Sequence, residues 1–188
     1  MSVHSSFLKI LSSIGSFSKE EQQLLKQELQ LKELKKDDIL LNEGDICSSA
    51  CFVVSGSFYQ YYTDTDLNIH IIDLSVENDW ALNHKSFSSR QPSKHIIQAF
   101  EDSIIYKLSI ESAHKLIGKS QTFLQLMRIL EESTTRVSFF DNNYTPDEKY
   151  AYILENKPEL LQTFPQKLIA SYLKITPETL SRVRKRLG

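Results

Sequence analysis

Basic residues gather at one end of this sequence, where they far outnumber the acids. The closing segment FPQKLIASYLKITPETLSRVRKRLG runs from Phe164 to Gly188. From Pro165 onward it holds six basic residues and one acid, Glu178, whereas residues 1–164 hold 16 basic and 23 acidic residues. Lysine and arginine at this density are suited to binding phosphate groups. Because the whole chain has a net charge of −2, any affinity for a polyanion must come from this local block.

The basic block predicts a helix over residues 177–187 with two different faces. Thr176 and Pro177 form a helix start, since a hydroxyl can cap the first turn and proline suits the first helical position. At 100° per residue, one side of this helix is apolar and the opposite side is polar. The apolar side consists of Leu180, Val183 and Leu187. The polar side consists of Glu178, Arg182 and Lys185, flanked by Ser181 and Arg186.

A second helix is predicted immediately upstream, in the PQKLIASYL segment. Only residues 174–176 separate it from the helix at 177–187, and Ala170 is small enough for the two helices to cross closely. Two short helices joined by a tight turn, the second with a basic outer face, are typical of a helix-turn-helix whose second helix enters a major groove. Arginine reads guanine and glutamate accepts from cytosine. The residues expected to contact double-stranded DNA are Thr176, Glu178, Thr179, Ser181, Arg182, Lys185 and Arg186.

Two other interpretations of this block remain open. It could be a solvated basic helix at a chain end, or the C-terminal helices of a ligand-sensing protein could mediate protein–protein contact alone. The outward position of Glu178, Arg182 and Lys185 favours DNA binding.

The segments before the basic block predict an α+β fold. Residues 18–30 indicate a helix, because Ser18 and Glu21 have the spacing of a capping box. From residue 34 to 108, short β-branched runs separated by turn signals predict a small sandwich or barrel. The helical period returns from Ser109, and the polar segment DNNYTPDE at 141–148 is typical of a hinge.

The predicted helix at 119–140 carries an apolar stripe. It can pack on its own domain or form a coiled-coil-like dimer interface, and its length of about three heptads does not decide between them. Under the second alternative, the dimer interface consists of Phe123, Leu126, Met127, Leu130 and Val137.

Composition narrows the function classes. The chain has 188 residues, of which 40% are hydrophobic, and only two cysteines, so we expect a globular protein in the reducing cytoplasm. We see no cationic leader and no apolar run long enough to span a bilayer. No nucleophile–base pair, phosphate loop or metal-ligand spacing stands out, so we expect neither an enzyme nor a bound metal or cofactor.

Cys47 and Cys51 would lie about 13 Å apart along one extended strand, too far for a disulfide, so a redox switch would need a bend between them.

The quoted segments resemble the transcription regulators related to the cyclic-AMP receptor protein and Fnr, the Crp/Fnr family. The closing helices are similar to that family's helix-turn-helix, and LKKDDILLNEGD with ACFVVSGSFYQYY is similar to its first β-roll turns. The resemblance implies an α+β protein with a cyclic-nucleotide-binding-type β-roll and dimerisation helices over 1–140 and a helix-turn-helix domain over 141–188. It further implies a homodimer on a palindromic DNA site, with RNA polymerase and a small-molecule effector of unknown identity as further partners.

Two departures from the family pattern affect its usual properties. Lys174 stands where glycine is usual in the turn, and a left-handed conformation there would cost roughly 1 kcal/mol. Members that bind cyclic AMP hold its phosphate with a Gly-Glu pair and an Arg-Ser/Thr-Ala run, and neither occurs in the corresponding stretch. We therefore expect no control by cyclic AMP. The residues that could still line an effector pocket are Trp80, Lys85, Phe87, Ser89, Arg90 and Ser93.

Overall fold

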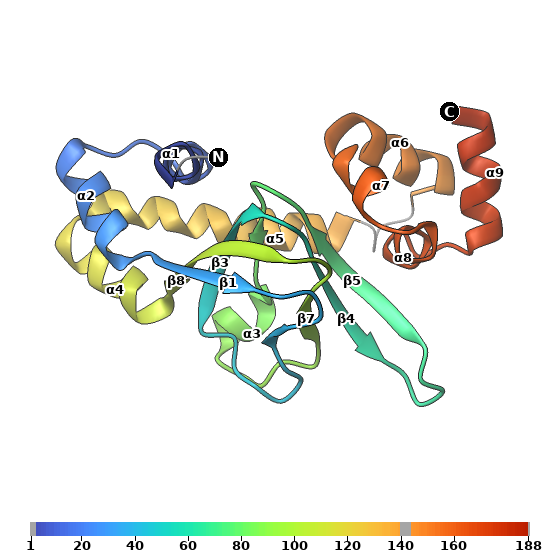
Figure 1. Ribbon diagram of the computed structural model, residues 1–188, viewed down its shortest axis with the longest axis horizontal. Helices are drawn as coiled ribbons and strands as arrows, with labels where there is room; N and C mark the ends of the chain where they lie inside the picture. Colours follow the sequence, from blue (N-terminus) through green and yellow to red (C-terminus); the bar gives the residue numbers. More distant parts are fainter. Residues whose placement is uncertain (1–2, 140–143, 188) are drawn as a thin grey trace.

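The computed structural model describes residues 3–139 and 144–187. Its centre is a β-roll of two antiparallel four-stranded sheets, with helices at both ends (Figure 1). The first sheet has the order β1-β8-β3-β6, with bounds Gln30–Leu34, Ser103–Ser109, Ser49–Ser55 and Trp80–Ala81. The second has the order β2-β7-β4-β5, with bounds Ile39–Leu41, Ile96–Ala99, Phe58–Thr63 and Ile69–Ser75. The α+β fold with an N-terminal β-roll is therefore confirmed.

Glycine and aspartate shape the turns that the sequence predicted between these strands. Gly56, between β3 and β4, has a φ of 90°, and a Cβ there would lie 2.1 Å from the Ser103 hydroxyl oxygen. The β4–β5 hairpin is closed by Asp64, whose carboxylate accepts from the backbone N–H groups of Asp66 and Asn68. These turns fix the register in which the outer strands pair.

The helices lie before, between and after the strands. Those of the N-terminal part are α1 (Val3–Ile14), α2 (Lys19–Glu28), α3 (His84–Ser89), α4 (Ile110–Lys119), the 3₁₀ helix η1 (Gln121–Leu126) and α5 (Met127–Phe139). Those of the C-terminal part are α6 (Pro146–Asn156), α7 (Glu159–Thr163), α8 (Gln166–Tyr172) and α9 (Pro177–Leu187). The Ser18–Glu21 capping box is confirmed at the start of α2. No helix in the part of the chain that the structure describes is long and apolar enough to span a membrane.

The single helix predicted for 119–140 is wrong in its first part, because Lys119 ends α4 and residues Gln121–Leu126 form the 3₁₀ helix η1. Ser120 caps this segment through the Thr122 N–H, and its hydroxyl also donates to Glu21. Phe123 is fully buried and stacks on Phe17 at a centroid distance of 5.4 Å. These contacts hold the segment against α2 and the loop before it, and regular α-helix begins only at Met127. Residue 140 lies outside the described residues.

Buried side chains form two clusters. The larger one fills the β-roll and extends under α1, α2, α4 and α5. The second joins β5 to the C-terminal helices, so Ile71, Leu74 and Val76 pack with residues of α6 to α9. The predicted boundary between residues 140 and 141 lies outside the described residues. Of the predicted hinge, residues 145–148 form the cap and first turn of α6 instead, with a capping box between Thr145 and Glu148.

Candidate nucleic-acid interface

The turn between α8 and α9 has a helix-ending geometry that brings the two helices together. Lys174 is left-handed, with a φ of 56°, as anticipated for the position where glycine is usual. The Lys174 N–H donates to the Ser171 carbonyl and the Ile175 N–H donates to the Ala170 carbonyl, both at 3.0 Å. This pair of bonds is a Schellman motif with Lys174 at its left-handed position. The chain therefore reverses within a few residues, and α9 packs across the buried Ala170.

Helix α9 has one buried face and one exposed face, as its sequence predicts. Thr176 precedes the helix, and its hydroxyl accepts from the Thr179 N–H at 3.2 Å. Leu180 and Val183 are buried against the neighbouring helices. The remaining predicted DNA-binding side chains, Glu178, Ser181, Arg182, Lys185 and Arg186, are exposed. In Figure 1, α9 is the outermost helix at one end of the molecule.

Glu178 and Arg182 form an ordered pair of opposite charges along α9. The pKa of Glu178 is lowered, first by its own backbone N–H, then by the Thr176 hydroxyl and by the charge of Arg182. The Nε of Arg182 donates to the Glu178 carbonyl at 3.3 Å. The Glu178 carboxylate is therefore an ionised acceptor. Arg182 lies one turn further along the helix, and its guanidinium bonds back to the Glu178 carbonyl. This places an acceptor and a fork of donors on one exposed face.

Two cations connect α6 to the α8–α9 unit, one through an ion pair and one through a hydrogen bond. Arg186 forms an ion pair with Asp147 in the first turn of α6. Lys149 is buried, and its Nζ donates to the Leu173 carbonyl at the end of α8 at 3.0 Å. Burial lowers the pKa of the Lys149 ammonium. Arg186 is thus engaged in an ion pair within the protein.

Sequence reasoning missed three cations near this surface. Lys167 and Lys174 are exposed and line a groove of about 550 Å³ between α8 and the β4–β5 hairpin. Arg184 is exposed on α9. All three residues belong to the basic block noted in the sequence. The positions of Lys167 and Lys174 beside the hairpin follow only from the packing of α8 on β5.

The C-terminal helices dock on the edge strand β5. The Ile71 N–H, at the open edge of that strand, donates to the Ser171 hydroxyl at 2.9 Å. The rings of Phe100 and Phe164 lie 5.0 Å apart, and Lys157 forms an ion pair with Asp79. The C-terminal helices are thus held to the β-roll by polar and apolar contacts at the ends of α6 and α7 and in α8.

The six predicted effector-pocket residues do not converge on one cavity. Trp80 is 2% exposed and contacts Phe52 edge-on, while its indole N–H donates to Ser13. Arg90 ends α3 in a left-handed conformation, and its Nη1 donates to the Cys47 carbonyl. Lys85 and Ser89 are exposed on α3, and Ser93 is buried. Phe87 lines a cavity between α3, α4 and α5, which none of the other five residues lines.

Polar groups of the same stretch bond to one another. The Asn83 amide donates to the Ser93 hydroxyl at 3.1 Å, and that hydroxyl donates to the His95 carbonyl at 2.7 Å. Amide nitrogens of Asn83 and Gln60 also lie 3.2 and 3.1 Å from His95 Nδ1. Because amide nitrogens only donate, Nδ1 must accept, which requires the neutral ring. Burial, together with Lys85, lowers the pKa of His95 in agreement with this.

Cys47 and Cys51 are both buried and reduced. Burial raises the pKa of both thiols, that of Cys51 to about 12. Cys47 precedes β3 and donates weakly to the Ser49 carbonyl, whereas Cys51 lies within the strand. Neither thiol has the exposed, electropositive surroundings that favour reaction.

The predicted dimer stripe divides between two environments. Phe123 and Leu126 are buried in the chain's own core. Leu130 and Val137 are half-buried, and Met127 is 52% exposed. Leu124, which the sequence interpretation left out, is 54% exposed one turn before. The open apolar surface of this helix is therefore centred on Leu124 and Met127.

Comparison with known proteins agrees with this architecture. Residues 31–120 match the family described as the cyclic nucleotide-binding domain. FixK2 from Bradyrhizobium japonicum is 17% identical, with a TM-score of 0.65 over 85% of this chain and 84% of that chain. The catabolite activator protein of Thermus thermophilus is 19% identical, with a TM-score of 0.54 over 94% and 86%. The sensor domain of the transcriptional regulator DNR from Pseudomonas aeruginosa is 17% identical, with a TM-score of 0.58 over 77% and 95%.

The fold and these matches define a class of protein. No curated protein matches the sequence. At these identities the solved structures show a shared fold, which is a β-roll followed by a long helix and a C-terminal helical unit. Residues 31–120 match the cyclic nucleotide-binding domain family, and the chain shares its fold with these solved structures, so the fold that the noted resemblance implied is confirmed.

Proposed function

We propose that this protein is a DNA-binding transcription regulator of the Crp/Fnr type and not an enzyme. The observation that carries the proposal is the two-sided character of α9. Leu180 and Val183 anchor the helix, and Glu178, Arg182 and Lys185 are left exposed on its other side. An ionised acceptor and two cations on a protruding helix suit base edges and phosphates in a major groove. The catabolite activator protein and DNR, named as regulators, share the fold.

The proposal includes a homodimer on a palindromic operator. Each chain presents one α9, and two-fold symmetric operators mirror two-fold symmetric proteins. Leu124 and Met127 supply exposed apolar surface on the long helix, which supports pairing there. Phe123 and Leu126 do not take part, because they are buried within the chain itself.

We further propose that this DNA binding needs no cyclic AMP. A buried phosphate requires converging donors and a fixed cation. In the corresponding stretch the donors Asn83 and Ser93 bond to each other, and Arg90 is directed to the Cys47 carbonyl. A ligand shifts an equilibrium only through its differential affinity for the two states. A domain that hardly binds the nucleotide therefore cannot be switched by it.

A gel shift on genomic fragments without any nucleotide tests the first part. Retarded fragments that compete with one another, but not with bulk DNA, are the expected result; uniform or absent retardation would support the alternative of protein contact alone. Titration calorimetry with cyclic AMP and cyclic GMP tests the last part. Micromolar binding that Arg90→Ala removes would contradict it.

A further inference from the structure

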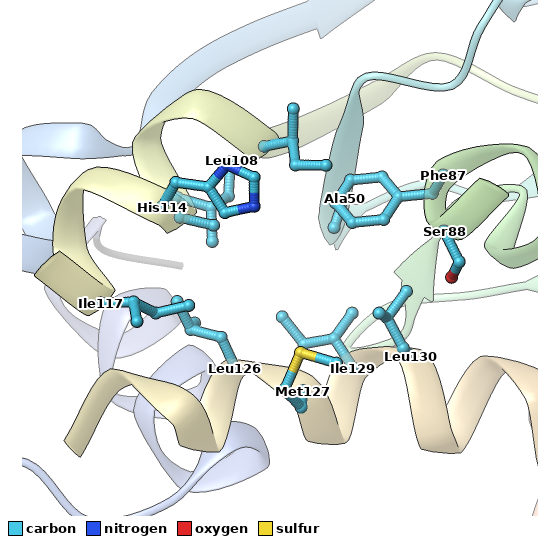
Figure 2. A pocket seen from close by; sticks show the side chains of 12 residues that line it. Ala50, Phe87, Ser88, Leu108, His114, Ile117, Leu126, Met127, Ile129 and Leu130 are labelled. Carbon is cyan, nitrogen blue, oxygen red and sulfur yellow. The ribbon is translucent and has the colours of Figure 1, made fainter. Parts of the chain in front are cut away.

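A cavity of about 250 Å³ lies between α5 and the face of the first sheet that carries Ala50 and Leu108 (Figure 2). Helix α4 encloses it on one side and α3, through Phe87, on the other. The space exists because Ala50 and Ala113 are small where the surrounding positions carry large apolar side chains. It brings Phe87, predicted for an effector site, next to Met127 and Leu130, predicted for a dimer interface.

The lining determines which class of molecule the cavity can hold. Ten of its twelve lining residues have aliphatic, aromatic or thioether side chains, and the other two are Ser88 and His114. A charged group would lose its hydration there without a fixed counter-charge, which is costly. A dry cavity of about 150 Å³ lined by similar side chains is large enough to bind benzene. A small uncharged apolar molecule therefore fits in both size and chemistry.

The cavity shares only Met127 with the surface that a second copy would cover. Leu126, Ile129 and Leu130 line it, and they belong to the face of η1 and α5 that packs on the β-roll. Leu124 and Arg128 lie on the opposite, exposed face of the same helix. A partner helix on that face would contact Leu124 and the exposed part of Met127, and of these two only Met127 also lines the cavity.

The cavity wall also contains the junction between the 3₁₀ helix η1 and α5, at Leu126 and Met127. A molecule in the cavity would therefore contact the end of η1 and the first turn of α5 together. We propose that this cavity binds a small uncharged apolar molecule of the size of a single-ring aromatic hydrocarbon, and that its occupancy acts on α5 through this junction. The binding is independent of DNA, whereas its effect on operator affinity rests on the proposed function.

Methionine labelling gives a direct assay, because Met1 and Met127 are the only methionines of the sequence. Protein labelled with ¹³C at the methionine methyl groups is titrated with toluene, and Met127→Leu assigns the two resonances. We expect the Met127 resonance to shift and saturate, since an aromatic ring in the cavity would lie beside its methyl group. Ala113→Leu and Ala50→Val fill the cavity and should each weaken toluene binding by at least about tenfold. Leu124→Ala, outside the cavity, should bind as the unmodified protein does.

The absence of a saturating shift would overturn the binding site, as would equal binding by the filled variants. Because Met127 also lies on the proposed dimer surface, the titration is made at fixed protein concentration, and a resonance that responds to dilution but not to toluene would overturn the binding site. Circular dichroism of each variant confirms that it is folded, and the two filling substitutions lie on different elements. Operator affinity with and without saturating toluene tests the coupling; an unchanged affinity would contradict action through α5. Failure of DNA binding itself would leave the toluene result intact.

Discussion

Replacing Lys174 by glycine should stabilise the protein, although it removes a side chain. A left-handed non-glycine residue costs about 1–2 kcal/mol, and Lys174 has a φ of 56°. Glycine relieves that strain but loses about 0.5–1 kcal/mol through the greater freedom of the unfolded chain. The net gain in the free energy of unfolding is then about 0–1.5 kcal/mol, with a central value of about 0.7 kcal/mol. For a chain of this length the central value corresponds to a rise in melting temperature of about 1–3 °C.

The matched control for this prediction is Lys174→Ala, which removes the same side chain but keeps a Cβ in the left-handed position. Urea unfolding followed by circular dichroism gives both free energies, and hydrogen exchange at the Leu180 and Val183 amides reports on α9 itself. Glycine should exceed alanine in stability by about 0.7 kcal/mol. Equal stability of the two variants would refute the strain at this turn, and a less stable glycine variant would refute the geometry from which it is deduced.

Four further predictions follow from the same contacts. Arg182→Ala should weaken specific DNA binding by about 1–3 kcal/mol in anisotropy titrations, and an unchanged site preference would contradict a base contact. Lys185→Ala should weaken binding to all sequences and flatten the salt dependence by about one unit in the same assay, and an unchanged slope would contradict a phosphate contact. Leu124→Glu, on the exposed side of η1, should give monomers in sedimentation with the β-roll still folded, and a dimer that persists would place the interface elsewhere. Lys149→Met removes the donor to a buried carbonyl and should cost about 1–3 kcal/mol in urea unfolding, whereas the exposed Lys94→Met should change stability by less than about 0.5 kcal/mol.

The parts of the fold that sequence predicted correctly are those with a local cause. The strands β2, β3, β4, β5, β7 and β8 follow from β-branched runs bounded by turn residues. The left-handed Lys174 follows from the short distance between two helices, since the chain must reverse within that turn. The two faces of α9 follow from a helical period alone.

The parts that sequence missed depend on contacts between distant segments. Strand β1, QLKEL, is largely exposed and shows no alternation, and it forms only because it pairs with β8. The 3₁₀ geometry of η1 accompanies contacts with α2 and the loop before it, which no local pattern records. Lys149 has the composition of a surface residue, yet it is buried because the end of α8 supplies a carbonyl for its ammonium group. The cavity beside Ala113 likewise arises where α3, α4, η1 and α5 meet strands β3 and β8.

The central claim is sequence-specific DNA binding through α9 without a nucleotide effector. Its most direct test is recovery and sequencing of genomic fragments bound by the purified protein in the absence of cyclic AMP, in parallel with Arg182→Ala. The account predicts one enriched sequence with two-fold symmetry for the unmodified protein, and loss of that preference in the variant. Fragments recovered without any common sequence, or the same sequence enriched equally by Arg182→Ala, would contradict it.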